Sequence, residues 1–359
     1  MARGEIQPGG LPGDSAGGPR VPILGRAALA SFVVTLMVLE AVSRTMIAPL
    51  TVRGGFEQFS ALVEEIRDAG HSPVILFLGT SHVQCAILPA VIERRLGLER
   101  GAVLNAGLGA SAPYEQMRLY AAVEESLGSA RLAVLETSPL YFNRGLANDA
   151  RLRLDLDTRL HYPAEVSKRA DWLAGWAFSI WDRRRTWRAV ATRAVRSALG
   201  HAGLEWPVFD SDGYPGIPGA PSARGQIAVD ADRASLTLFE RYSFDDEAVQ
   251  EFAALLARIR GHGTRVVLLE YPLFPELERF LETRYPDVKK REAAVLAGPL
   301  SSYPVLSVGH ARAAELMADF RDAHHLTRTG AARFSAMLAE LPEFRAMANA
   351  ARVSATTSR

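Results

Sequence analysis

Short runs of apolar residues alternate along most of the chain with longer segments in which apolar positions recur every three or four residues. Short apolar runs are typical of strands buried on both faces of a parallel sheet, and the longer spacing is typical of amphipathic helices. The runs predict strands at Val74–Leu78, Ala102–Leu104, Leu132–Leu135, Val266–Leu269 and Val305–Val308. The expected helices are Phe56–Ala69, Leu88–Leu96, Tyr114–Leu127, Asp246–His262 and Thr329–Leu341.

This alternation predicts an α/β fold, because parallel strands need crossover connections that are usually helical. We expect a flavodoxin-like, three-layer, doubly wound parallel sheet over residues 56–345. Residues 144–238 interrupt the alternation, with tryptophans among basic residues followed by a Gly/Pro-rich stretch. We interpret them as an insertion, helical first and irregular later. Residues 346–359 are expected to be a flexible C-terminal tail.

The N-terminal region carries two different patterns. Gly, Pro and small polar residues dominate residues 1–20, which predicts a disordered tail. Residues 24–44 are mostly small or apolar, and roughly 17–25 such residues cross a bilayer as a helix. A cleaved signal peptide, ending at Ala41-Val42-Ser43, and a buried soluble helix are the alternatives. The long preceding tail favours a single-pass anchor in the cytoplasmic membrane, and the arginines around the span favour an extracytoplasmic domain.

The composition of the chain excludes several classes of function. Lys and Arg number 41 against 40 Asp and Glu, so the chain has no charge excess for binding nucleic acid. The single cysteine, Cys85, excludes an internal disulfide and cysteine-based zinc sites. The glycine-rich stretch Asn105–Gly109 lacks both the P-loop lysine and the full dinucleotide fingerprint. No cofactor is therefore expected.

Ligands of doubly wound sheets bind beyond the carboxyl ends of the strands, so the residues after each strand are the candidates for chemistry. The first expected strand is followed by Gly79-Thr80-Ser81-His82. A hydroxyl at such a strand-to-helix turn can serve as a nucleophile, although Ser and Thr also cap helices routinely.

A serine nucleophile needs a base. The position of each of the eight histidines relative to the strands leaves four candidates: His82, His310, His324 and His325. Asp322 and His325 are three residues apart in a segment that follows the last expected strand and opens a helix. On one tight turn the Asp322 carboxylate can reach His325 Nδ1 and leave Nε2 facing the serine.

These residues resemble the SGNH hydrolases, also called the GDSL esterase superfamily. The family's first block is a strand followed by Gly-x-Ser, matched by Gly79-Thr80-Ser81, and its last block is Asp-x-x-His, matched by Asp322–His325. Its second block supplies a glycine, matched within Asn105–Gly109.

The resemblance implies an SGNH hydrolase-like fold with Ser81 as the nucleophile, His325 as the base and Asp322 as its orienting acid. It also implies an oxyanion hole built from the backbone N–H groups of Ser81 and Gly107. The third block departs from the family pattern, because no asparagine directly follows the third strand. Asn143 is the candidate for a displaced oxyanion donor. The literal Gly13-Asp14-Ser15 follows no strand and is assigned no function.

The apolar N-terminal span, the Gly-Thr-Ser-His turn, the Glu-x-Ser-Pro turn and the late Asp-x-x-His are similar to a narrower branch of the superfamily. That branch contains the anchored extracytoplasmic proteins of alginate O-acetylation and of D-alanine transfer to teichoic acids, which work beside a membrane-bound O-acyltransferase. The resemblance implies transfer of an acyl group to or from a cell-envelope polysaccharide, with such an acyltransferase as a partner.

Five further residues are candidate substrate contacts: His82, Glu136, Glu270, Trp172 and Trp176. Aromatic faces stack on sugar rings, but the tryptophans equally suit a membrane interface or packing of the insertion onto the core. A metal site can be drawn from Asp322, His324, His325 and His310, yet no spacing typical of zinc is present and we expect no metal.

The main hypothesis is a membrane-anchored extracytoplasmic serine esterase or acyltransferase that acts on O-acyl groups of a cell-envelope polysaccharide. A catalytically inactive envelope-assembly protein, binding polysaccharide or a membrane-bound O-acyltransferase, is the first alternative. A lipase-like esterase for small lipids is the second, and it would need an apolar groove. The distance between Ser81 and His325 distinguishes the main hypothesis from the inactive protein.

Overall fold

The structure of the chain is a computed structural model. The structure describes residues 23–47, 67–68, 70, 72–109, 111–143, 173–174, 208–209, 215–216, 239, 242–309, 312 and 314–357. The helix expected at Phe56–Ala69 lies almost wholly outside the described residues. So does most of the expected insertion, together with its two candidate substrate contacts, Trp172 and Trp176.

The centre of the fold is a sheet of five parallel strands in the order β2-β1-β3-β6-β7. The strands are β1 (Ile75–Gly79), β2 (Val103–Gly107), β3 (Leu132–Thr137), β6 (Arg265–Glu270) and β7 (Val305–Leu306). In chain order this is 2-1-3-4-5, the strand order of flavodoxin-like sheets. The expected α/β class is confirmed, and every expected strand overlaps an observed one.

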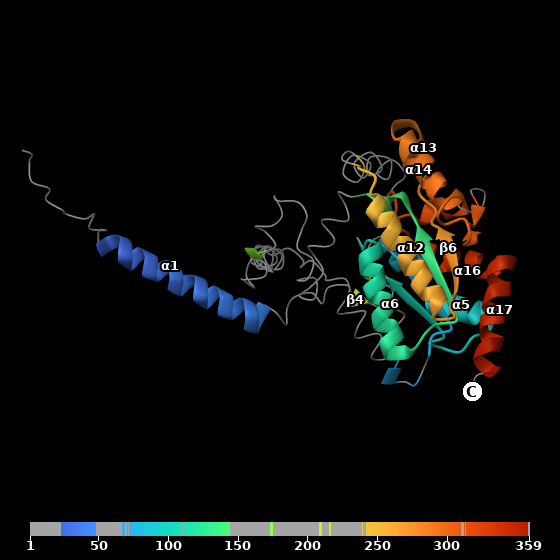
Figure 1. Cartoon of the computed structure of the whole chain (residues 1–359), viewed down its shortest axis with the longest axis horizontal. Coiled ribbons are helices and arrows are strands. Elements are labelled where there is room, and N and C mark those ends of the chain that lie inside the picture. The colour runs from blue at the N-terminus through green and yellow to red at the C-terminus, as the bar shows by residue number, and fades with distance from the viewer. Residues whose placement is uncertain are drawn as a thin grey trace, which may run out of the picture.

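Helices cover both faces of the sheet, as the parallel arrangement requires. The helices α6 and α12 lie side by side over one face, and α5, α16 and α17 lie over the other (Figure 1). The bounds are α4 (Ser81–Ala86), α5 (Pro89–Leu96), α6 (Pro113–Leu127), α12 (Asp246–Gly261), α13 (Pro275–Arg284), α14 (Pro286–Ala297), α16 (Arg328–Glu340) and α17 (Pro342–Thr357).

Alternate residues of the strands β1, β2, β3 and β6 enter two separate hydrophobic cores. Ile75 and Phe77 of β1 pack with α5, α16 and α17, whereas Leu76 and Leu78 pack with α6 and α12. All four side chains have no exposed surface. Since successive side chains of a strand point to opposite faces, an unbroken apolar run is what a sheet covered on both faces demands.

Helix boundaries follow local signals in the sequence. Asp245 caps α12 by accepting a hydrogen bond from Glu247 N–H, and Thr327 caps α16 by accepting one from Gly330 N–H. Gly97 ends α5 in the left-handed conformation, with φ of 65°.

The C-terminal region differs from the expectation of a flexible tail at 346–359. Residues Pro342–Thr357 form the helix α17, and Phe344, Ala348 and Ala351 are buried in the core beside β1 and β3. Small and polar residues dominate this helix, so its apolar stripe is narrow and the sequence pattern alone did not reveal it. The helices α13 and α14 were also not expected, because their buried positions, such as Leu277 and Leu281, stand among many charged residues.

At the N-terminal end, α1 (Ile23–Val42) continues into a short π-helical segment, η1 (Ser43–Ile47). Over Ala27–Thr45 the mean hydropathy is 1.7, and the helix is long and apolar enough to cross a membrane. Within the expected insertion, two short strands pair antiparallel, β4 (Val208–Phe209) and β5 (Pro215–Gly216).

Candidate active site

The turn between β1 and α4 holds Ser81 at the carboxyl edge of the sheet. Thr80 caps α4 by accepting a hydrogen bond from His82 N–H, and Ser81 is the first helical residue. The chain crosses here from β1 to β2 on one side, while β3 pairs with β1 on the other side. This is the point where strand order reverses, the usual ligand crevice of doubly wound sheets.

The structure brings the three expected triad residues into one hydrogen-bonded chain. Ser81 Oγ lies 2.9 Å from His325 Nε2, and His325 Nδ1 lies 2.9 Å and 3.0 Å from the two oxygens of Asp322. Ser81 and His325 are 244 positions apart in the sequence. This is the nucleophile, base and orienting acid geometry of a serine hydrolase triad.

The loop that carries Asp322 and His325 is closed by its own backbone. Phe320 pairs with Leu326 in an antiparallel bridge, and Arg321 N–H donates to the His325 carbonyl at 2.9 Å. Asp322 Oδ1 also accepts hydrogen bonds from the N–H groups of His324 and His325, at 3.0 and 2.9 Å. The carboxylate therefore holds the turn and the imidazole at once.

Arg321 is a neighbour of the triad that the sequence motif did not single out. Its Nη2 and Nε lie 2.9 and 3.2 Å from Asp322 Oδ2. Two charged N–H donors on one carboxylate oxygen help to fix the carboxylate in position. Its place directly before Asp322 was the signal available in the sequence.

For both His325 and Asp322, burial and hydrogen bonding shift the pKa in opposite directions. Burial lowers the pKa of His325 below its usual 6.5, and the hydrogen bond and charge of Asp322 oppose that shift. Burial alone would raise the pKa of Asp322, but the hydrogen bond and charge of His325 lower it well below its usual range. Near neutral pH the site thus holds an ionised carboxylate and a neutral imidazole, the form a general base requires.

Glu136, expected to touch substrate, is instead buried beneath the nucleophile turn with no exposed surface. Its carboxylate accepts hydrogen bonds from Thr80 N–H at 2.7 Å and Thr80 O–H at 2.9 Å, and it lies 2.8 Å from His82 Nδ1. A buried carboxylate needs such partners to offset the loss of hydration. Glu136 is therefore a positioning residue for both neighbours of Ser81.

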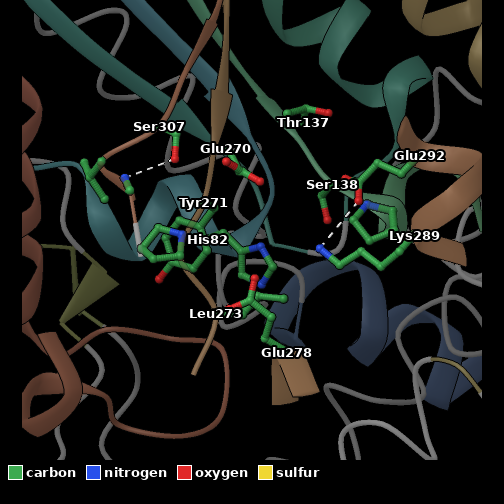
Figure 2. Close-up of a pocket in the computed structure, with 14 residues that line it drawn as sticks. His82, Thr137, Ser138, Glu270, Tyr271, Leu273, Glu278, Lys289, Glu292 and Ser307 are labelled. Atoms are coloured by element: carbon green, nitrogen blue, oxygen red, sulfur yellow. Dashed lines mark hydrogen bonds and ion pairs between the residues drawn. The ribbon is translucent and has the colours of Figure 1, made fainter. Parts of the chain in front are cut away.

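His82 is also buried, and its ring stacks on Tyr271 with centroids 4.5 Å apart and planes within 6°. The ring centroid of His82 lies 6.0 Å from that of His325. His82 also lines a pocket next to the triad, together with Glu270, another expected substrate contact, which lies at the end of β6 (Figure 2).

The oxyanion hole differs from the expectation at Gly107. Its N–H donates to Asn105 Oδ1 at 2.9 Å, while Asn105 Nδ2 donates to the carbonyls of Val83 and Ile87. A Cβ on Gly107 would come within 2.3 Å of Gln84 N. Close approach of the α4 backbone, rather than a free N–H, is thus the reason for a glycine here, and Asn105 clamps α4 to β2.

Asn143 occupies a structural position in the described conformation. It forms an isolated bridge with Phe244, and its Oδ1 accepts from Ser243 N–H at 3.4 Å. The Ser81 N–H remains the expected oxyanion donor with a suitable place, since the first N–H groups of a helix have no intrahelical partner.

A metal site remains an alternative use of part of this cluster. Among the described residues, Asp322, His324 and His325 offer ligand atoms within 4.8 Å of one another. Both ring nitrogens of His325 already have partners in Asp322 and Ser81, so a metal would have to break the triad. The donor set therefore fits proton transfer better than metal binding.

Comparison with known proteins does not assign the chain to a family. No protein-family model matches it, and no curated protein sequence matches it.

Proposed function

We propose that this protein is a serine esterase or acyltransferase of the SGNH hydrolase type. The observation that carries the proposal is the continuous hydrogen-bonded chain from Ser81 through His325 to Asp322. An inactive binding protein has no need to hold a hydroxyl 2.9 Å from an imidazole that a carboxylate orients from behind.

The proposed reaction uses the three residues of this hydrogen-bonded chain to form and then release an acyl-serine. Ser81 attacks an acyl carbonyl while His325 Nε2 takes its proton, and Asp322 stabilises the imidazolium that forms. The tetrahedral oxyanion accepts a hydrogen bond from Ser81 N–H. Collapse transfers the proton from His325 to the departing alcohol and leaves an acyl-serine, which water or a sugar hydroxyl then attacks with His325 again as the base.

The apolar helix α1 supports the proposed location. It would anchor the protein in the cytoplasmic membrane, with the catalytic domain on the extracytoplasmic side and O-acyl groups of a cell-envelope polysaccharide as the substrate. A membrane-bound O-acyltransferase would be the partner that supplies or receives acyl groups. This location, substrate and partner are inferred from the apolar helix and from the sequence motifs of the site.

Covalent labelling tests the proposed nucleophile. We expect a fluorophosphonate probe to add one adduct to the wild-type protein at Ser81, detected by intact-mass analysis and peptide mapping. Ser81→Ala and His325→Ala should abolish the adduct, because one removes the nucleophile and the other its base.

Two matched variants control for general damage. Ser301→Ala removes an exposed serine hydroxyl, and His262→Ala removes a histidine at the end of α12 that contacts Tyr120 and Glu124. Both should label like the wild type. A folded wild-type protein that stays unmodified, and does not hydrolyse p-nitrophenyl acetate, would contradict the enzyme proposal and favour the envelope-assembly protein.

A further inference from the structure

A second group of polar side chains lies next to the triad and has no part in the acyl chemistry. It lines the pocket at the carboxyl ends of β3, β6 and β7, and the helices α13 and α14 contribute to its wall. The side chains that matter here are His82, Thr137, Glu270, Glu278, Lys289 and Glu292 (Figure 2).

Negative charge dominates this pocket. Its lining contains three glutamates and one lysine, so the formal charge of these four side chains is 1 − 3 = −2. Lys289 Nζ lies 3.7 Å from Glu292 Oε2 and so already faces one of the carboxylates. A carboxylate, phosphate or sulfate group entering here would meet repulsion, whereas a positive group would be attracted.

Glu292 responds both to burial and to the neighbouring carboxylates. Its pKa is raised to about 7, mainly by burial; the charges of Glu270 and Glu136 add to the shift, and Lys289 opposes it. A cation placed among these groups would relieve the repulsion that the single lysine leaves.

A buried hydroxyl in the same wall also lacks a partner. Thr137 is buried at the end of β3, and its Oγ1 makes no hydrogen bond to any described residue. Buried polar side chains are nearly always hydrogen-bonded, so an orphan that lines a pocket indicates a group supplied by a ligand.

A compact metal ion fits this pocket poorly. Among the described residues, Asp322, His324 and His325 are the only set of three or more His, Cys, Asp or Glu side chains with ligand atoms within 4.8 Å of one another, and none of the pocket glutamates belongs to that set. An ammonium group has three N–H donors that can reach separate acceptors. Carboxylates spread around a pocket suit it better than they suit a single ion.

We propose that this pocket binds an amino group and thereby selects an amine-bearing substrate, either an amino sugar or an aminoacyl ester, for the adjacent serine. The role of the pocket in selecting a substrate rests on the proposed function, but the binding of an amine does not require catalysis. It also means that the part of the substrate next to Ser81 is not an anionic sugar such as a uronate.

Binding can be measured apart from catalysis by titrating the full-length Ser81→Ala protein in detergent calorimetrically. Glucosamine and glucose form one matched pair of ligands, glycine ethyl ester and ethyl acetate form the other, and galacturonate is the anionic control. We expect the amine of at least one pair to bind about tenfold or more tightly than its neutral partner, and galacturonate not to bind. The pair that shows the preference identifies the amine's source.

Two substitutions that change the charge of the pocket in opposite directions test whether the amine binds there. Glu270→Gln should weaken amine binding about tenfold, and Lys289→Met should strengthen it several-fold, because one removes an attracting charge and the other a repelling one. Glu282→Gln is the matched control, since this exposed residue lies one turn beyond Glu278 on α13 and does not line the pocket.

Equal affinity for the amines and their neutral partners would overturn the inference, as would an affinity that neither Glu270→Gln nor Lys289→Met changes. Tight binding of calcium chloride with no binding of either amine would replace it with a metal site. If the pocket prefers amines but Ser81 of the wild-type protein cannot be labelled, the proposed function is refuted and the selectivity of the pocket still holds. If Ser81 is labelled but the pocket shows no preference for amines, this inference is refuted and the proposed function still holds.

Discussion

At the scale of single residues, one buried carboxylate fixes the surroundings of Ser81. Glu136 accepts hydrogen bonds from Thr80 and lies 2.8 Å from His82, so it holds both neighbours of Ser81 from below. The sequence predicted that Glu136 follows the third strand and contacts substrate, whereas the structure places it within β3 and buries it. Position along a strand shows which edge of the sheet a residue reaches, whereas its burial depends on what packs over it.

The lowered pKa of His325 predicts the acid limit of activity. The base works only when neutral, and burial extends the neutral form to pH values below the usual 6.5, against the opposing charge of Asp322. We therefore expect kcat/KM for p-nitrophenyl acetate to rise with pH and to reach half its plateau below pH 6.5. A pH profile of kcat/KM measures this midpoint.

Asp322→Asn tests the cause of that midpoint. Removing the carboxylate charge removes a contribution that raises the pKa of His325, so the midpoint should move to lower pH. Loss of the orienting acceptor should also reduce the plateau by about 10³–10⁴-fold. A midpoint above pH 7 in the wild type, or a shift to higher pH in the variant, would show that another group limits the rate.

At the scale of elements, the contact between β2 and α4 sets the position of Ser81. Gly107 leaves room for the α4 backbone, and Asn105 donates to carbonyls of that helix. Both residues belong to the glycine-containing motif recognised in the sequence. Their role in packing two elements together was not visible there, because a sequence motif does not show which backbone comes close.

Gly107→Ala should therefore impair both stability and activity. The added Cβ would come within 2.3 Å of Gln84 N, and this backbone atom cannot move away unless the whole of α4 shifts. We expect a loss of about 1–3 kcal/mol in the free energy of unfolding and a lower kcat, because Ser81 moves with the helix. Urea denaturation and steady-state kinetics report the two effects.

Gly261→Ala is the matched control for this substitution. A Cβ there has no atom within 4 Å, and alanine favours the helical conformation at the end of α12, so its unfolding midpoint should equal or slightly exceed that of the wild type and its kcat should be unchanged. If Gly107→Ala also behaves like the wild type, the proposed tight contact does not exist.

The helix α17 gives a second prediction for an element. Phe344 is fully buried, and its ring centroid lies 6.1 Å from that of Phe77 in β1. Phe344→Ala should lower the free energy of unfolding by about 3–5 kcal/mol, whereas Val353→Ala, on the exposed side, should change it by less than about 0.5 kcal/mol. Equal effects in denaturant titrations would mean that the helix does not belong to the core.

At the scale of the whole molecule, an apolar helix precedes an α/β domain whose own hydrophobic residues are buried in two cores. The window Ala27–Thr45 is only 6% buried, and Leu29, Phe32 and Met37 are each more than 60% exposed. A soluble protein rarely leaves so much contiguous apolar surface in water. The helix therefore requires a cover, and its length suits a bilayer.

The full-length protein should sediment with membranes, resist extraction by carbonate and dissolve in detergent. Intact mass of the purified protein should still include α1, as expected of an uncleaved anchor. A mature protein that begins after Ser43 would instead show that the helix is a cleaved signal peptide. C-terminal fusion to alkaline phosphatase, which is active only outside the cytoplasm, tests the orientation.

The sequence by itself determined the strands, most of the helices over the sheet and the three residues of the hydrogen-bonded chain Ser81, His325 and Asp322. It did so because buried parallel strands and amphipathic helices leave periodic apolar patterns, and because Ser81 and the Asp322–His325 turn are local motifs at strand ends. Tertiary structure alone decided how these pieces interact. It buried Glu136, gave Gly107 N–H another acceptor, placed α17 in the core and gathered carboxylates from separate elements into one pocket. Such contacts join residues far apart in the chain, and a linear pattern cannot show which of them meet.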